Sequence, residues 1–213
     1  VDGAGRIVTT GTNGGSIEVL GNRVAVMDQA QLDASGDNGG VAVLVGGDYQ
    51  GRNSDVQNAN ITYFGPQASI KADAIQNGDG GKVIVWADDT TRAFGTISAH
   101  GGSVAGNGGL VETSAHHLET RGVRVSMAAP RGQAGTWLLD PLDVAINNNS
   151  TNASYGGWTG SNPFSFAPTG SPSNVYAGDI QSALNGGTDV LITTGVGGAE
   201  AGNITVFGTS DLN

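Results

Sequence analysis

The sequence has no cysteine and only two methionines among its 213 residues. Without thiols, the chain can form neither disulfide bonds nor cysteine-ligated metal centres, and thiol catalysis is excluded. Its apolar runs are short, and none approaches the roughly 20 residues that a membrane-spanning helix requires. We therefore expect no disulfide framework, no membrane insertion and no cofactor.

Positive charge is also scarce. Nine basic residues stand against nineteen acidic ones, so the formal net charge is −10, and no lysine or arginine follows Arg131. This balance argues against nucleic acid and against anionic membrane surfaces as partners. All charged residues after Arg131 are acidic. Attraction between this acidic end of one chain and the more basic end of a neighbouring chain would favour a homo-oligomer or a filament.

Glycine, in contrast, is abundant, with 37 residues, and it belongs to a repeated pattern. An apolar residue is followed by a turn, a Gly-Gly pair or its substitute, and an alternating apolar run. Copies of the pattern begin at Leu32, Ile70, Ile97, Val125 and Leu191. The second glycine lies at positions 15, 40, 81, 109, 135 and 202. The shorter spacings cluster near 26 residues, which is typical of a solenoid.

Short runs rich in Val, Ile, Leu and Thr predict strands, and glycine and asparagine suit the corners between them. Two longer spacings leave room for insertions at residues 50–60 and 147–173. The pattern predicts an all-β parallel β-helix of about eight coils, with an antiparallel sandwich as the alternative. We expect coils over 1–146, an insertion over 147–178, and a short helix with further coils over 179–213. Asp179 is expected to cap that helix, with Ile180, Ala183 and Leu184 facing inward.

Several strings resemble the filamentous haemagglutinin family of large bacterial exoproteins. They are residues 80–92 (GGKVIVWADDTTR), 95–99 (GTISA), 106–114 (GNGGLVETS), 134–146 (AGTWLLDPLDVAI) and 179–193 (DIQSALNGGTDVLIT). The resemblance implies a right-handed β-helix, a Gram-negative source, an extracellular or cell-surface location and an outer-membrane export partner of the two-partner route. The sequence lacks the Asn-Pro-Asn-Gly-type motif of that family's secretion domain, so we expect a shaft segment of a longer protein.

The second insertion carries no charged residue between positions 144 and 178 but holds five of the twelve aromatic residues. These are Tyr155, Trp158, Phe164, Phe166 and Tyr176. Such a segment suits packing on the solenoid or a neighbouring subunit, or stacking on sugar rings. It is therefore the predicted contact site for a ligand or partner. Asn148, Asn149 and Asn152 stand in Asn-x-Ser/Thr sequons and are candidate glycosylation sites.

Paired carboxylates raise the question of catalysis. Asp88 and Asp89 lie close to Arg92, and acid–base chemistry on a polysaccharide needs such groups. We favour the interpretation that these aspartates form a corner and pair with Arg92. In the string Asp140-Pro141-Leu142-Asp143, Pro141 is likewise expected to stiffen a strand exit and Asp140 to cap the turn. We therefore predict a protein that is not an enzyme.

Metal binding is not predicted either. His116 and His117 are adjacent, so in a strand they point to opposite faces, and only His100 remains as a further histidine. The glycine-rich segment 77–81 (NGDGG) offers one weak copy of a calcium loop, whereas a calcium β-roll needs tandem copies. Both sets of residues are expected at solvated surfaces or corners.

We conclude from the sequence that the chain is a structural or adhesive segment of a secreted or surface-displayed exoprotein. It would serve attachment, biofilm or filament assembly, and contact a host or neighbouring-cell glycan or protein surface. A self-assembling subunit of an extracellular fibre and a polysaccharide-acting β-helix enzyme are the alternatives.

Overall fold

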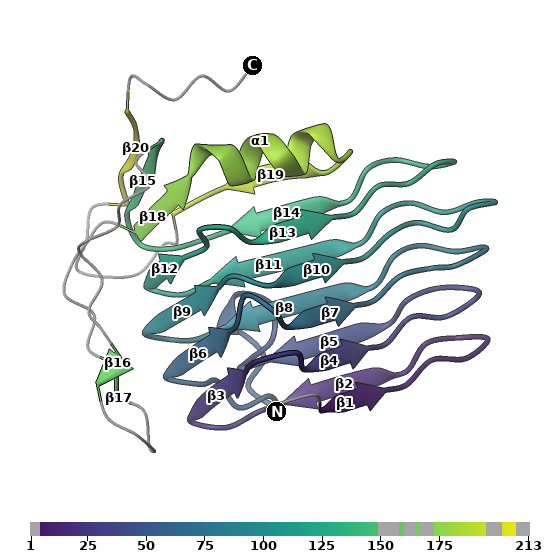
Figure 1. Cartoon of the computed structure of the whole chain (residues 1–213), viewed down its shortest axis with the longest axis horizontal. Helices are drawn as coiled ribbons and strands as arrows, with labels where there is room; N and C mark the ends of the chain where they lie inside the picture. Colours follow the sequence, from purple (N-terminus) through teal and green to yellow (C-terminus); the bar gives the residue numbers. More distant parts are fainter. Residues whose placement is uncertain (1–4, 149–157, 160–164, 167–172, 195–201, 208–213) are drawn as a thin grey trace.

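The computed structural model describes residues 5–148, 158–159, 165–166, 173–194 and 202–207. The chain winds as a parallel β-helix in which each of the first five coils contributes three short strands (Figure 1). The predicted fold class is therefore confirmed. The antiparallel sandwich is excluded, because every strand of the three main sheets pairs in parallel with its neighbours.

The strands stack into three sheets, named here sheet one, sheet two and sheet three. Sheet one holds β1 (Arg6–Val8), β4 (Gln31–Asp33), β7 (Ser69–Lys71), β10 (Thr96–Ser98) and β13 (Arg124–Ser126). Sheet two holds β2 (Ser16–Val19), β5 (Ala42–Val45), β8 (Lys82–Trp86), β11 (Leu110–Ser114), β14 (Thr136–Leu139) and β19 (Asp189–Ile192). Sheet three holds β3 (Arg23–Val26), β6 (Ile61–Phe64), β9 (Thr90–Ala93), β12 (His117–Glu119), β18 (Ser173–Tyr176), β15 (Val144–Asn147) and β20 (Ile204–Val206).

The core consists of columns of like residues, one from each coil. In sheet one, Leu32, Ile70, Ile97 and Val125 occupy one register position and are buried. In sheet two the corresponding column contains Val43, Val83, Val111 and Trp137. Since side chains alternate along a strand, the residues between these columns point outward. The repeated pattern in the sequence thus records which face of each strand is inside.

The Gly-Gly pairs lie where a coil leaves the long turn after sheet one and enters sheet two. At this point the chain passes close to its own outgoing segment, as in the hydrogen bond from the Gly81 amide to the Ala72 carbonyl (2.7 Å). A Cβ on Gly40 would overlap the Ala72 carbonyl of the next coil, and one on Gly109 would overlap the Gly81 carbonyl. Only glycine allows this approach of backbones in successive coils.

The first predicted insertion folds against the outside of the solenoid. It leaves sheet two after β5, forms the short 3-10 helix η1 (Tyr49–Gly51) and returns to sheet three at β6. In the second insertion, β16 (Trp158–Thr159) and β17 (Ser165–Phe166) form a small antiparallel pair, and the insertion ends earlier than predicted because residues 173–178 already form β18 and the start of α1.

The last coil departs from the others. Strand β18 is inserted between β12 and β15 in sheet three, and α1 (Ala177–Asn185) then lies over β13 at the end of sheet one (Figure 1). Because α1 occupies the sheet-one position, the next strand, β19, stacks on β14 in sheet two. The predicted alignment of Leu191 with the sheet-one copies is therefore wrong, and the described sheets hold five to seven strands rather than eight.

The short helix itself is confirmed, but two of its details are wrong. Asp179 lies inside the first turn instead of capping the helix, and its carboxylate accepts a hydrogen bond from the Gly122 amide (2.8 Å). Ile180 and Ala183 are buried as expected, whereas Leu184 is 48% exposed. Asp179 therefore fastens the helix to the coil below it, and Leu184 faces away from the core.

Candidate functional site

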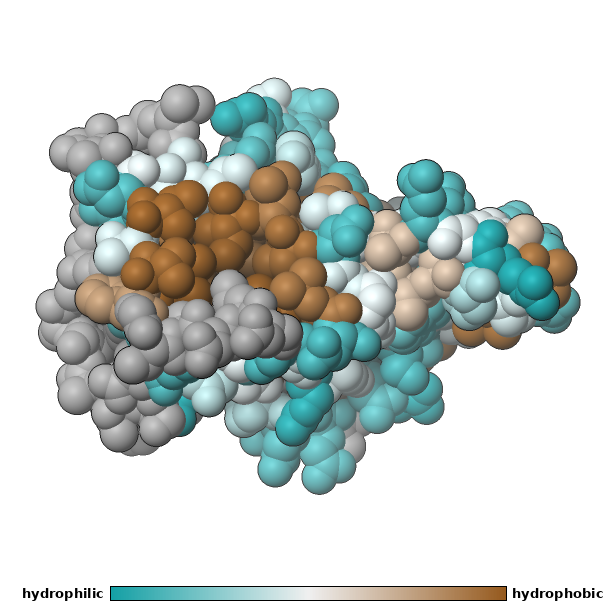
Figure 2. All heavy atoms as spheres, turned by 90° about the horizontal axis from the view of Figure 1, so that it is seen from above, coloured by the Kyte–Doolittle hydropathy of each residue, from teal (hydrophilic) through white to brown (hydrophobic). Residues whose placement is uncertain are grey.

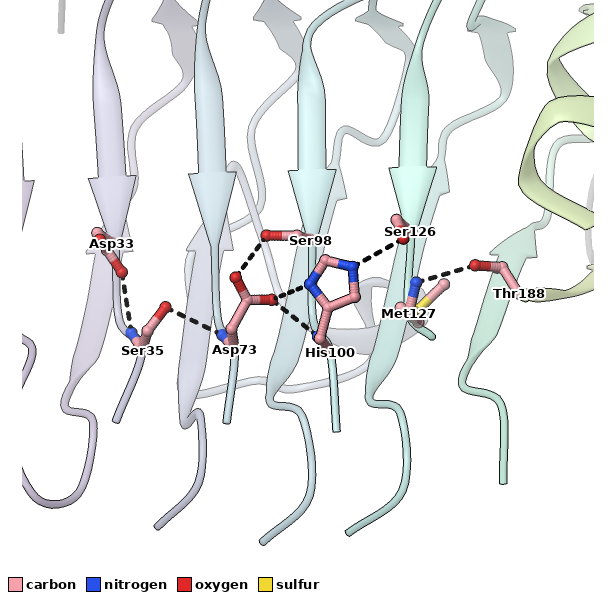
Figure 3. A network of polar contacts seen from close by, with 8 residues as sticks. All are labelled: Asp33, Ser35, Asp73, Ser98, His100, Ser126, Met127 and Thr188. Carbon is pink, nitrogen blue, oxygen red and sulfur yellow. Dashed lines mark hydrogen bonds and ion pairs between the residues drawn. The ribbon is translucent and has the colours of Figure 1, made fainter. Parts of the chain in front are cut away.

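The outer corner at the end of sheet one brings together polar residues from three successive coils. Ser98 of β10 is the register partner of Ser126 of β13, so their side chains follow each other on the outer face. Asp73 and His100 each come two residues after the end of their strands, β7 and β10. We call Asp73, Ser98, His100 and Ser126 the corner cluster (Figure 3).

The corner cluster contains a serine, a histidine and an aspartate in series. The Ser126 hydroxyl lies 2.8 Å from Nε2 of His100, and Nδ1 of His100 lies 2.9 Å from Oδ1 of Asp73. Asp73 also accepts hydrogen bonds from the His100 amide (2.8 Å) and from the Ser98 hydroxyl (2.8 Å). Both carboxylate oxygens are thus engaged, which fixes the orientation of the imidazole.

The electrostatics of the cluster follow from these contacts. Burial acts to raise the pKa of Asp73, but the hydrogen bonds from His100 and Ser98 outweigh it and hold that pKa below its ordinary value. The hydrogen bond to Asp73 raises the pKa of His100 above its ordinary value, against the opposing effect of partial burial. The pair is therefore an ion pair below the raised pKa of His100 and a neutral imidazole–carboxylate pair above it.

Further hydrogen bonds extend from the cluster to coils on both sides. The Ser35 hydroxyl accepts from the Asp73 amide (3.0 Å), and the Thr188 hydroxyl accepts from the Met127 amide (2.9 Å). A shallow, open groove borders the cluster on the side of Asp73 and Ser35. The corner cluster is consequently the middle of a polar network that runs along the solenoid (Figure 3).

A second group of ionisable residues lies on the outer face of sheet two. Glu112 of β11 is fully buried there, although its position in the alternation points outward. The loop of residues 46–58, called the outer loop, lies against this face and bonds to Glu112 through the Gln50 amide (3.0 Å). The Gln50 side chain donates to Asp140 (3.0 Å).

Burial raises the pKa of Glu112 to about 7, and the negative charges of Asp140 and Asp48 add to that effect. The hydrogen bonds from Gln50 and Ser114 act in the opposite direction. Asp48 itself is held by the Lys82 ammonium group (2.6 Å). Glu112 thus serves as a point where the outer loop is fastened to the solenoid.

The predicted contact site is only partly within the described residues. Trp158 and Phe166 are register partners in the β16–β17 pair, whereas Tyr155 and Phe164 lie outside the described residues. Tyr176 is half-buried at the start of α1, and its ring lies 5.9 Å from the Arg121 guanidinium carbon. A contact role for these aromatics therefore stays a prediction.

Of the glycosylation candidates, Asn148 is exposed at the end of β15, while Asn149 and Asn152 lie outside the described residues. No modification is tested by the structure, so all three remain candidates.

Asp88 and Asp89 do form a corner, between β8 and β9. Asp88 accepts hydrogen bonds from the Trp86 indole (3.1 Å) and the Asn58 amide (2.9 Å). The expected pairing with Arg92 is wrong: the guanidinium bonds to Glu119 (2.7 Å), its register partner in sheet three. The difference arises because Arg92 belongs to the following strand and points along its own sheet.

The other polar candidates also have structural positions. Asp140 accepts a hydrogen bond from the Thr193 hydroxyl (2.6 Å), and Asp143 accepts one from the Asn203 amide (2.6 Å). His116 is exposed, and His117 is partly buried in β12. Within the described part of the chain, no three His, Cys, Asp or Glu residues are grouped as a metal site.

Sequence reasoning missed both the corner cluster and the burial of Glu112. Asp73 and His100 are 27 residues apart, and His100 and Ser126 are 26 apart, so each step is one coil of the solenoid. The repeat length of about 26 residues was thus the signal in the sequence that could have identified these residues as neighbours. The burial of Glu112 had no such signal, because it depends on the path of the outer loop.

Comparison with protein-family models and with curated protein sequences gives no match for this chain. Among the described residues, no helix has the length and hydropathy needed to cross a membrane.

Proposed function

We propose that the chain is a rigid shaft segment with an attached contact surface, part of a secreted or surface-displayed bacterial exoprotein of the filamentous haemagglutinin type. The supporting observation is the parallel stack itself. One register runs through sheet one from β4 to β13, so each coil is hydrogen-bonded to the coils before and after it. Such a stack suits a rod that carries contact surfaces away from a cell.

The strings that carry the family resemblance occupy positions that the coil needs. Residues 134–146 form β14, the following turn and most of β15, with the Trp137 side chain fully buried in the core. Residues 80–92 begin at a Gly-Gly pair and continue through β8, the Asp88 corner and most of β9. The resemblance is thus based on residues that specify the coil, which supports a shared architecture.

The contact role is assigned to the second insertion, which leaves the solenoid after β15 and returns at β18. Uncharged polar residues with spaced aromatics can stack on sugar rings while their amides and hydroxyls bind sugar hydroxyls. Host or neighbouring-cell glycans, or protein surfaces, are the proposed partners. An outer-membrane export partner would act on the full-length protein.

The test compares the wild-type chain with Trp158→Ala on an array of glycans and in adhesion to cultured cells. We expect Trp158→Ala to lose at least about tenfold in binding, the size of one stacking contact. Val104→Ala is the matched control, because Val104 is 64% exposed in the turn of another coil. Equal binding by wild type and Trp158→Ala, with both chains folded, would remove the contact role from this insertion.

A second candidate function is self-assembly into an extracellular fibre. Strands β19 and β20 are the last of sheets two and three among the described strands, and Leu191, Ile204, Val206 and Phe207 are about half exposed there. Figure 2 looks down on this end and shows a continuous apolar patch. Open strand edges with apolar side chains favour addition of another chain.

Electron microscopy and sedimentation of the purified chain test this candidate. Filaments that disappear in Leu191→Asp, but persist in the control Leu184→Asp on α1, would support assembly through the strand edges. A chain that stays monomeric at high concentration would contradict self-assembly, and the shaft function would then be the remaining proposal.

A further inference from the structure

We propose that Ser126 is an activated nucleophile that takes up the acyl group of a carboxylic ester, with His100 as its general base. Asp73 acts as a positioning residue. This inference goes beyond the shaft function and does not depend on it, because it is based only on the corner cluster.

The order of the hydrogen bonds assigns the roles. An ionised Asp73 can only accept, so the proton on the imidazole is held at Nδ1, and Nε2 is left as an acceptor. The Ser126 hydroxyl at 2.8 Å then donates to Nε2, which is the direction needed for removal of its proton. The two other donors on Asp73, the His100 amide and the Ser98 hydroxyl, keep the carboxylate from rotating away.

The aspartate is the most buried of the three groups. The side chain of Asp73 is 15% exposed and that of His100 is 38% exposed, and Ser126 is partly exposed at the end of β13. A carboxylate shielded from water interacts more strongly with the imidazole, and a serine at the surface can be reached by substrate. A shielded carboxylate beside a partly exposed histidine and serine is what an orienting acid, a base and a nucleophile require.

The reaction follows from these positions. Oγ of Ser126 attacks the ester carbonyl carbon while Nε2 of His100 takes the hydroxyl proton, and His100 returns that proton to the departing alcohol. The acyl group is then an ester of Ser126. Water, deprotonated by His100, attacks this ester, the carbon–Oγ bond breaks, and Ser126 recovers a proton from His100. The sum is one ester and one water converted to one acid and one alcohol.

The outer face of sheet one indicates the class of substrate. Its outward side chains are polar in two columns, the second of which includes two members of the cluster: Gln31, Ser69, Thr96 and Arg124 in one, and Asp33, Lys71, Ser98 and Ser126 in the other. Arg124 precedes Ser126 by two residues, so it projects from the same face about 7 Å along the strand. Its guanidinium can stabilise the oxyanion that forms. An open, polar face suits a short O-acyl group carried on an extended, hydrated polymer such as an acylated polysaccharide.

The experiment uses the full chain and a fluorophosphonate probe, which labels activated serines covalently. Mass spectrometry of the digested protein then locates and quantifies the label. We expect the label on Ser126, at a rate at least about 100-fold above that on Ser69, the control serine on the same face without a histidine partner. The rate should rise with pH as His100 loses its proton.

Variants separate catalysis from structure. Ser126→Ala should abolish labelling and the release of p-nitrophenol from p-nitrophenyl acetate, and His100→Gln should lower both by about 100-fold in folded protein. Asp73→Asn should shift the pH profile of labelling to lower pH, because the charge that raises the pKa of His100 is removed. Labelling of Ser126 that is no faster than that of Ser69, or that is independent of pH in the wild-type chain, would overturn the proposal even if the variants fail to fold.

Discussion

The outer faces of sheets one and two are built from the same coils, yet one is open and the other is covered. On sheet one the outward residues are polar, and two of them, Ser98 and Ser126, belong to the corner cluster, in which the His100 side chain is 38% exposed. On sheet two, Leu44, Ile84, Glu112 and Leu138 follow one another at an outward position and are all buried. The comparison teaches that the inner face of a coil sets its fold, whereas an insertion decides what the outer face becomes.

The largest expected effect on stability comes from a charge on the covered face of sheet two, compared with the same charge on the open face of sheet one. Ile84→Asp puts a carboxylate at a site with no solvent exposure and should lower the free energy of unfolding by at least about 4 kcal/mol. Thr96→Asp, at an exposed outward position of β10, should change it by no more than about 0.5 kcal/mol. Urea denaturation measures both. Similar losses for the two variants would show that the outer faces do not differ in burial.

The next effect concerns Glu112 and pH. Its pKa is about 7 in the folded state against an ordinary value of 4.5, so the folded state keeps a proton that the unfolded state releases. Stability should therefore fall as pH rises from 4.5 to 7, by about 3 kcal/mol in total. Glu112→Gln should remove this fall and be the more stable protein at pH 8.

Urea denaturation of the wild-type chain and of Glu112→Gln at pH 5 and pH 8 measures how the free energy of unfolding of each protein changes with pH. Asp179 contributes a loss of the same sign, since burial raises its pKa to about 6, but it is present in both proteins and cancels in the difference. Parallel pH profiles for wild type and Glu112→Gln would contradict the covered environment of Glu112.

A smaller effect is expected at the open face. His100 has a raised pKa, so its ion pair with Asp73 stabilises the fold fully below about pH 6.5 and loses that contribution as pH rises through the folded-state value. His100→Gln should cost roughly 1 kcal/mol at pH 6 and less at pH 9, because the partly exposed pair is screened by solvent. A cost that does not change with pH would show that packing, not charge, is lost.

The smallest effect concerns the rim of the covered face. Lys82 is 37% exposed where it pairs with Asp48 of the outer loop, so Lys82→Met should cost about 0.5 kcal/mol or less. The cost should shrink further in 1 M salt, where exposed charges are screened. A salt-independent loss above about 2 kcal/mol would mean that the contact between Lys82 and Asp48, and not the hydrogen bond between Gln50 and Glu112, holds the loop.

Much of the solenoid could be predicted because its rules are local and repeated. The alternation in residues 83–86 and the glycines before it specify a strand and a close backbone passage, and these recur in each coil. Sheet three was harder to recognise: β9 and β12 carry threonine, arginine, histidine and glutamate, whose alternation is weak. Their strand character comes from pairing with neighbouring coils rather than from local preference.

The end of the chain and the sites depended on long-range contacts. Nothing in residues 177–192 indicates that α1 replaces a strand of sheet one and moves β19 to sheet two. The same applies to Asp179, whose partner Gly122 is 57 residues away. The corner cluster, in contrast, was within reach, because polar residues one repeat apart must be neighbours once the coil is accepted.

The place where β18 enters sheet three has a mechanical consequence. Tension along the solenoid is carried by the hydrogen bonds between successive coils, with all three sheets sharing the load at each level. Between β9 and β12 three residue pairs lie in register, whereas β12 and β18 share one register pair, Glu119 with Asn174, and a hydrogen bond from the Leu118 amide to the Ser173 hydroxyl (2.9 Å). A stretched rod would therefore yield first at this junction, and the segment from β18 onward would detach while the earlier coils remained wound.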